Sequence, residues 1–114
     1  MKISLQALCA LIALLAEVSE VLAGGMARAE TRQAQILHMV RQDCGSCHGL
    51  TMKGGLGPSL LPSALADKDS EQLAYVILNG RHGTPMPPWR DFLSEAEARW
   101  VVDQLKKGLP DAKQ

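Results

Sequence analysis

Residues 42–50 read QDCGSCHGL, and this short stretch decides what the rest of the chain must fold around. Cys44 and Cys47 stand three residues apart, and His48 follows the second cysteine directly. The stretch lies at the end of a helix predicted over about residues 31–43, where apolar residues recur at helical spacing. A cysteine pair at this spacing can begin more than one kind of site, so the histidine and the surrounding pattern must separate them.

Two of the possible sites fit the pattern poorly. A thioredoxin-like dithiol follows a strand and opens a helix, whereas this motif follows a helical pattern in a chain without strand-like alternation. A structural zinc site needs four ligands, so His38 or His82 would have to join the three residues of the motif. Cys47 and His48 are adjacent, which is unusual for a zinc finger, and a second ligand pair is missing.

A covalently attached haem uses all three residues of the motif. Cysteines three apart lie on one side of a helical turn, so both sulfurs can reach the vinyl groups at one porphyrin edge. The imidazole of His48 can then bind the iron from one face of the ring. Because Cys-x-x-Cys-His is the attachment signal for c-type haem, we predict one covalent haem c held by Cys44 and Cys47.

The N-terminal residues have the pattern of an export signal. An apolar run follows Lys2, and the small-residue pattern Ala-Arg-Ala at residues 27–29 predicts cleavage before Glu30. A cut after Ala23 is the alternative. The apolar run stops at Glu17, shorter than a typical membrane span, so an uncleaved anchor is less favoured.

This pattern predicts how the chain is organised and where it works. We expect a cleaved signal peptide over residues 1–29 and one domain over residues 30–114, without stable insertion in a membrane. The expected compartment is the periplasm of a Gram-negative bacterium. Export suits c-type haem, which is attached outside the cytoplasm.

Charge and length restrict the possible partners. The chain has 114 residues with 12 basic and 12 acidic ones, and removing the predicted signal leaves it formally neutral. It therefore lacks the basic field that would bind nucleic acid or an anionic membrane surface. Because so short a chain buries little core, a cofactor is expected to fill its centre.

The remaining pattern is helical, with loops rich in glycine and proline. A short helical turn is predicted near residues 62–66. A second helix is predicted to start at Asp69 or Ser70, either of which can cap it, and to stop at Gly80.

The third helix has the clearest signals. Ser94 and Glu97 form a capping box, an apolar stripe follows at helical spacing, and Gly108 ends the pattern. The first and third helices each have an apolar face to bury, so we predict that the two terminal helices cross.

Haem iron needs a sixth ligand or an open position, and Met86 is the favoured ligand. It lies in TPMPP, where flanking prolines exclude a role on a helix face. Ordinary loop packing is the alternative role for this methionine. Bis-histidine ligation through His82 is the main competitor and would lower the potential. The other candidates are Met52, His38 and Met39.

The segments CGSCH, GLGPSL, GTPMPPW and LSEAEARWVVDQL, in this order, resemble the class I c-type cytochromes over essentially the whole predicted mature chain. More closely, RQDCGSCHGL together with GGLGPSL and NGRHGTPMPPWRDFLSEAEARWVVDQL is similar to the small NirC-type cytochromes, which accompany periplasmic haem-c/haem-d nitrite reductases in denitrifying bacteria. The resemblance implies an all-α fold with three main helices, whose terminal helices cross around one covalently bound haem.

The resemblance also implies a set of site residues. It places thioethers at Cys44 and Cys47 and axial ligands at His48 and Met86. It further implies that the carbonyl of Pro58 accepts a hydrogen bond from the other ring nitrogen of His48 and so orients the ring. Loops of this type need not carry a histidine where His82 stands, so alternative ligation remains open.

Three further side chains near Met86 are candidate haem contacts. Arg81 and Arg90 flank the loop and could pair with haem propionates, and Trp89 could pack on the ring or contact a propionate. For the two arginines, full solvation is the plainer alternative.

The predicted function is single-electron transfer and not catalysis, because a six-coordinate haem leaves no open position for a substrate. The resemblance proposes a dissimilatory nitrite reductase in denitrification as the partner that receives the electrons. We expect a monomer that meets its partner in a brief encounter with a small interface. Two alternatives are an accessory role in maturing the d-type haem of that reductase and general electron transfer to another periplasmic or membrane oxidoreductase. A haem sensor or enzyme would require Met86 to be absent from the iron.

Overall fold

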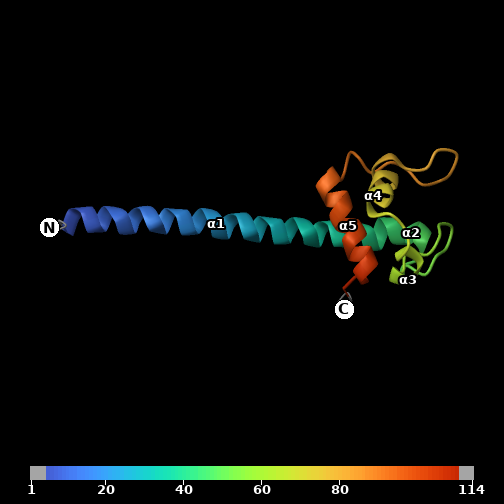
Figure 1. Ribbon diagram of the computed structural model, residues 1–114, viewed down its shortest axis with the longest axis horizontal. Coiled ribbons are helices and arrows are strands. Elements are labelled where there is room, and N and C mark those ends of the chain that lie inside the picture. Colours follow the sequence, from blue (N-terminus) through green and yellow to red (C-terminus); the bar gives the residue numbers. More distant parts are fainter. Residues whose placement is uncertain (1–4, 111–114) are drawn as a thin grey trace. The chain divides into compact units, whose positions relative to one another are not determined.

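The computed structural model describes residues 5–110, and this part of the chain is helical without strands (Figure 1). In chain order its elements are α1 (Leu5–Met39), the π-helical segment η1 (Val40–Cys44), α2 (Gly45–His48), α3 (Pro62–Leu65), α4 (Ser70–Asn79) and α5 (Glu95–Lys107). The predicted all-α class is confirmed. Residues 1–4 of the predicted signal and residues 111–114 of the predicted domain lie outside the described range.

The chain divides into two units, residues 1–35 and residues 36–114. The described residues of the first unit, 5–35, belong to α1, which begins at Leu5, so the predicted helix start near Thr31 is wrong. The reason is that no proline precedes Pro58 and the N-terminal segment is rich in the good helix formers leucine and alanine. Of the helices described, none combines the length and the apolar character needed to cross a membrane. The exposed apolar side chains of this unit include Leu5, Leu8, Ile12, Val21 and Met26.

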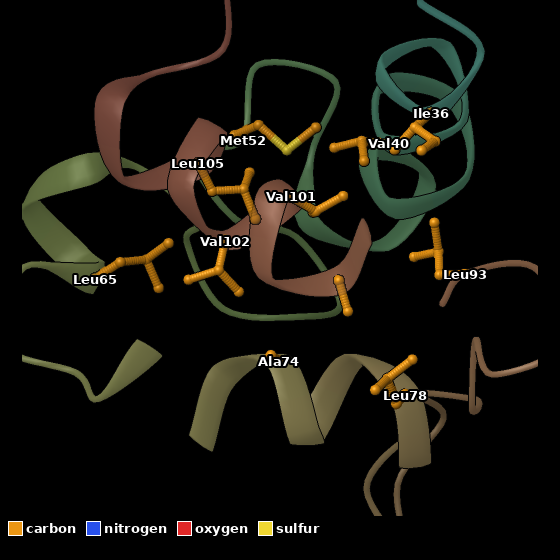
Figure 2. Close-up of a cluster of buried hydrophobic side chains, with 11 residues drawn as sticks. Ile36, Val40, Met52, Leu65, Ala74, Leu78, Leu93, Val101, Val102 and Leu105 are labelled. Atoms are coloured by element: carbon orange, nitrogen blue, oxygen red, sulfur yellow. The ribbon is translucent and has the colours of Figure 1, made fainter. Parts of the chain in front are cut away.

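The second unit is built around one hydrophobic core (Figure 2). Ile36 and Val40 contribute to this core from the segment that precedes the cysteine motif, and Val101 contributes from α5. Residues 36–40 and α5 therefore meet in the core, where the two terminal helices were predicted to cross. The buried side chains of the cluster are Ile36, Val40, Met52, Leu65, Ala74, Leu78, Leu93, Ala98, Val101, Val102 and Leu105.

The predicted caps place α4 and α5. The carboxylate of Asp69 accepts the N–H of Gln72 at 2.8 Å, and α4 ends before Gly80, which has a φ of 68°. At the start of α5, the hydroxyl of Ser94 accepts the N–H of Glu97 at 3.2 Å, and the Glu97 carboxylate accepts the N–H of Ser94 at 2.8 Å. Both predicted helix starts are confirmed, as is the short helix at residues 62–65.

Candidate functional site

The cysteine motif begins where the helical backbone changes its pitch. Cys44 is the last residue of the π-helical segment η1, and Cys47 and His48 lie on the short helix α2 that follows. The N–H of Gly45 bonds to the carbonyls of Val40 and Gln42. Such π-helical segments hold an extra residue per turn and recur at functional sites. The motif was predicted at the end of the first helix, but nothing in the residue pattern indicated this change of pitch.

Both cysteines of the motif are free thiols, and both are half-buried. Burial, with a smaller contribution from the neighbouring carboxylate of Asp43, raises the pKa of the Cys44 thiol to about 11, because both disfavour the negative thiolate. The Cys44 thiol is therefore neutral at physiological pH. This is the opposite of the lowered pKa that activates a dithiol redox pair, so it argues against a thioredoxin-like role.

The imidazole of His48 is held by the loop that follows the motif. Its Nδ1 lies 2.7 Å from the carbonyl oxygen of Pro58, which is the contact that the family resemblance implies. Because a carbonyl can only accept, Nδ1 donates the proton, and in the neutral ring Nε2 keeps a lone pair free. A histidine oriented in this way can bind a metal through Nε2.

Gly57, just before Pro58, also lies against the imidazole, and we call these two residues the imidazole cradle. A Cβ placed on Gly57 would lie 2.7 Å from Nδ1 and Cε1 of His48, closer than carbon atoms tolerate. The N–H of Gly57 also donates to the carbonyl of Cys47 at 2.8 Å, and the N–H of Gly54 donates to that of His48 at 2.8 Å. Two backbone hydrogen bonds thus join this loop to the cysteine motif. Gly57 was missed as a site residue, although its place in GLGPSL was a usable signal.

These observations test whether the residues fit a c-type haem, and they do. Two free thiols three residues apart can form the thioethers, and the oriented Nε2 of His48 is a suitable axial donor for iron. Gly57 leaves room for the imidazole where a larger residue would clash with it.

Met86 lies on a separate loop between α4 and α5. Its side chain is half-buried, and its carbonyl accepts the N–H of Arg81 at 3.2 Å. Beyond it, the N–H of Trp89 donates to the carbonyl of Ile77 at 3.1 Å, which ties the loop back to α4. Loop and helix also approach closely at Gly80, where a Cβ would lie 2.7 Å from the carbonyl oxygen of Met86.

The other predicted contacts near Met86 have different surroundings. Arg81 and His82 are exposed in the loop, whereas Trp89 is half-buried and packs against the core. The ring of Trp89 also contacts that of Phe92, with centroids 5.7 Å apart. Arg90 donates to the side-chain oxygen of Asn79 at 2.7 Å, so its guanidinium already has a partner.

The three minor candidates for an iron ligand are placed as helix or core residues. His38 is exposed on α1, and Met39 is half-buried against the core. Met52 is 6% exposed and belongs to the core, with a φ of 59° that is rare for a side chain other than glycine (Figure 2). Its thioether is therefore used in packing.

A hollow of about 470 Å³ lies between α4 and α5, away from the motif. Its guanidinium groups are already paired. Arg99 contacts the carboxylate of Glu71 at 2.9 Å, and Arg90 bonds to Asn79. We therefore place the functional site at the cysteine motif and not in this hollow.

Comparison with known proteins agrees with the fold. The family described as "Cytochrome C oxidase, cbb3-type, subunit III" matches residues 31–104. This range contains the cysteine motif, the imidazole cradle and the Met86 loop. The chain belongs to this family of c-type cytochromes, whose cofactor is haem c.

Individual relatives are similar to much of this chain. Cytochrome c55X of Pseudomonas aeruginosa is 57% identical over 77 residues, which cover 68% of this chain and 65% of that protein. A solved structure of a c-type cytochrome NirC shares 54% identity with a TM-score of 0.68, covering 69% of this chain and 93% of that one. Dihydro-heme d1 dehydrogenase of Pseudomonas aeruginosa is 37% identical over 89 residues, which are 78% of this chain but 18% of the enzyme.

Proposed function

We propose that this chain is a periplasmic carrier of single electrons with one covalently attached haem c. Cys44 and Cys47 would form the thioethers, and His48 and Met86 would be the axial ligands of the iron. The bound haem supplies a one-electron couple at its iron. With both axial positions taken by side chains, no position is left for a substrate, so electron transfer is the expected activity.

The observation that carries this proposal is the orientation of His48. The 2.7 Å contact from Nδ1 to the Pro58 carbonyl fixes the tautomer and aims the free Nε2 lone pair. The second axial side chain, Met86, sits on a loop tied to α4, which supports a fixed ligand geometry in both oxidation states.

The similarity to a cytochrome NirC supports a dissimilatory nitrite reductase as the electron acceptor in denitrification. With a formal net charge of zero, the chain would meet its partner with little long-range steering. The half-buried Trp89 and the exposed Arg81 remain candidate contacts of the haem and its propionates. We expect a monomer that forms brief, small interfaces.

Absorption spectra of the purified, haem-loaded protein test the ligand set. The ferric protein should show the long-wavelength charge-transfer absorption of a thioether–iron bond. Met86→Ala should abolish it, and Met39→Leu should keep it, because Met39 packs against the core. An unchanged spectrum in Met86→Ala would refute the assignment and favour a ligand-binding haem protein. His82→Ala would show whether this histidine competes for the iron.

A kinetic experiment tests the partner. Reduced protein mixed with the nitrite reductase and nitrite should re-oxidise at a rate that rises with enzyme concentration. If it stays reduced while another periplasmic cytochrome is oxidised, the nitrite reductase is not its acceptor. Oxidation by a different periplasmic or membrane oxidoreductase would then support the general carrier role.

The similarity to dihydro-heme d1 dehydrogenase favours one second candidate. A stretch of that enzyme, 18% of its length, is 37% identical to this chain, so a domain of this kind also occurs in an enzyme named for d1 haem. The chain could therefore serve the maturation of the d-type haem in the reductase. Deleting its gene distinguishes the two roles. If the chain is an assembly factor, the reductase in the deletion strain lacks its d-type haem. If the chain is a carrier, the reductase contains all its haem but turns over slowly.

A further inference from the structure

The loop that carries Met86 is closed by its own hydrogen bonds. The N–H of Arg81 donates to the carbonyl of Met86 at 3.2 Å, which makes residues 81–86 a small closed loop. Within it, the N–H of Thr84 donates to the carbonyl of Arg81 at 3.1 Å, and Gly83 has a φ of 77°. Residues 81–84 therefore form a tight turn at the tip of the loop.

One side chain, Thr84, joins the two ends of this closed loop. Its hydroxyl donates to the carbonyl of Arg81 at 2.7 Å and accepts the N–H of Met86 at 3.4 Å. A hydroxyl can do both at once, because it has one donor and two acceptor lone pairs. Pro85, between Thr84 and Met86, has no N–H, so the Met86 N–H is the next backbone donor that the hydroxyl can reach.

The backbone around Met86 is restricted on both sides. Pro85 has a fixed φ, and Thr84 and Met86 each precede a proline, which disfavours the helical conformation at both residues. These restrictions leave the backbone few alternatives, and the Thr84 hydroxyl selects among them by its two bonds. The position of the Met86 thioether thus depends on a side chain that need not touch the haem.

We propose that Thr84 is a positioning residue for Met86: its hydroxyl holds the closed loop in the form that presents the thioether to the haem iron. This rests on the ligand set of the proposed function and deepens it. If the loop opens, so that the Thr84 hydroxyl no longer reaches Arg81 and Met86, the hydroxyl bonds to water instead. Its two bonds within the loop therefore stabilise only the closed form. Removing the hydroxyl shifts the loop toward a form in which Met86 leaves the iron and an external ligand takes its place.

The test uses the haem-loaded ferric protein and imidazole as the competing ligand. Imidazole is titrated against Thr84→Val, which keeps the shape of the side chain, and against Thr84→Ser, which keeps the hydroxyl. The thioether–iron absorption reports Met86, and the reduction potential is measured in parallel. Thr51→Val is the control, because Thr51 is also exposed but lies in the loop after His48. The His82→Ala background separates external imidazole from this histidine.

Thr84→Val should bind imidazole about two- to tenfold more tightly than the parent protein, the range expected for one or two solvent-exposed hydrogen bonds. The reduction potential of Thr84→Val should be lower than that of the parent protein. Thr84→Ser and Thr51→Val should match the parent protein within twofold. If Thr84→Val does not fold, Thr84→Ala, which also lacks the hydroxyl, is compared with Thr84→Ser.

Several results would overturn the proposal, and they are distinguishable. If Thr84→Val matches the parent protein, the hydroxyl does not position Met86. If Thr84→Ser, which keeps the hydroxyl, behaves like Thr84→Val, the hydroxyl is not sufficient to hold Met86 and the packing of the whole side chain is responsible instead. If the parent protein lacks the thioether absorption and Met86→Ala changes nothing, the proposed ligand set itself fails and this inference fails with it.

Discussion

At the scale of single residues, the site depends on a glycine, Gly57, that has no side chain. Gly57 leaves room for the imidazole of His48, and a Cβ there would approach two of its ring atoms to 2.7 Å. Because the next residue supplies the carbonyl that bonds Nδ1, any shift of the loop away from the ring also weakens that bond. The glycine and the proline therefore act on the same ring from adjacent positions.

Gly57→Ala should accordingly destabilise the haem-loaded protein. The added methyl group must push the loop or the ring aside, which costs about 1–3 kcal/mol of unfolding free energy in a packed site. Denaturant unfolding checks the stability, and the reduction potential checks the His48 ligand. Gly45→Ala is the matched control, because its Cβ would meet neighbours at 3.4–3.6 Å, an ordinary contact distance, in a helical backbone. Equal stability of the two variants would contradict the steric argument.

Which site residues could be predicted depends on where their information lies. The attachment motif Cys44, Cys47 and His48 could be read directly because its chemistry requires a fixed local spacing. The partner carbonyl of Pro58 came only from family resemblance, since a contact over ten residues has no local signature. Thr84 had no signal at all, because an exposed threonine before a proline is ordinary in any loop.

At the scale of elements, the helices with local start and stop signals were predictable. The caps at Asp69 and Ser94 placed α4 and α5 because each satisfies backbone N–H groups that the helix leaves free. The start of α1 could not be predicted, because the uninterrupted helix formers before residue 31 give no boundary. The π-helical segment η1 could not be predicted either, because a change of pitch has no signature in the residue pattern.

The capping box of α5 yields a quantitative prediction at this scale. Ser94→Ala removes the oxygen that accepts the Glu97 N–H and should lower the unfolding free energy by about 1 kcal/mol. The loss falls on a helix whose inner face forms much of the core. Chemical denaturation of the haem-loaded protein measures it, with a denaturant slope equal to that of the parent. Ser63→Ala, a change at an exposed position inside α3, is the control and should be near neutral.

A loss in Ser94→Ala no larger than in Ser63→Ala would mean that water replaces the cap without cost. A changed denaturant slope would instead show that the variant alters the unfolded or native state more widely. In neither case would the box stabilise α5 as argued.

At the scale of the whole molecule, the cytochrome unit contains its own core and its own site. The buried cluster begins at Ile36, and its members as described lie in residues 36–114. The cysteine motif, the imidazole cradle and the Met86 loop lie there too. Among the side chains of the predicted signal that the structure describes, none belongs to this core or to the site. Removal of the signal should cost the cytochrome unit little stability.

We therefore predict that the chain is exported and cleaved, and that the mature protein begins at Glu30 and carries one haem. Mass spectrometry of the intact exported protein should give the mass of residues 30–114 plus a single haem, since Ala27 and Ala29 match the small-residue pattern of a cleavage site. Ala29→Phe should block this cut, leaving either the precursor or a product cut after Ala23. The haem-loaded fragment from Glu30 should unfold at the same denaturant concentration as the uncleaved variant. A mature protein that retains residues 1–29 in the membrane fraction would show instead that the apolar segment is an anchor.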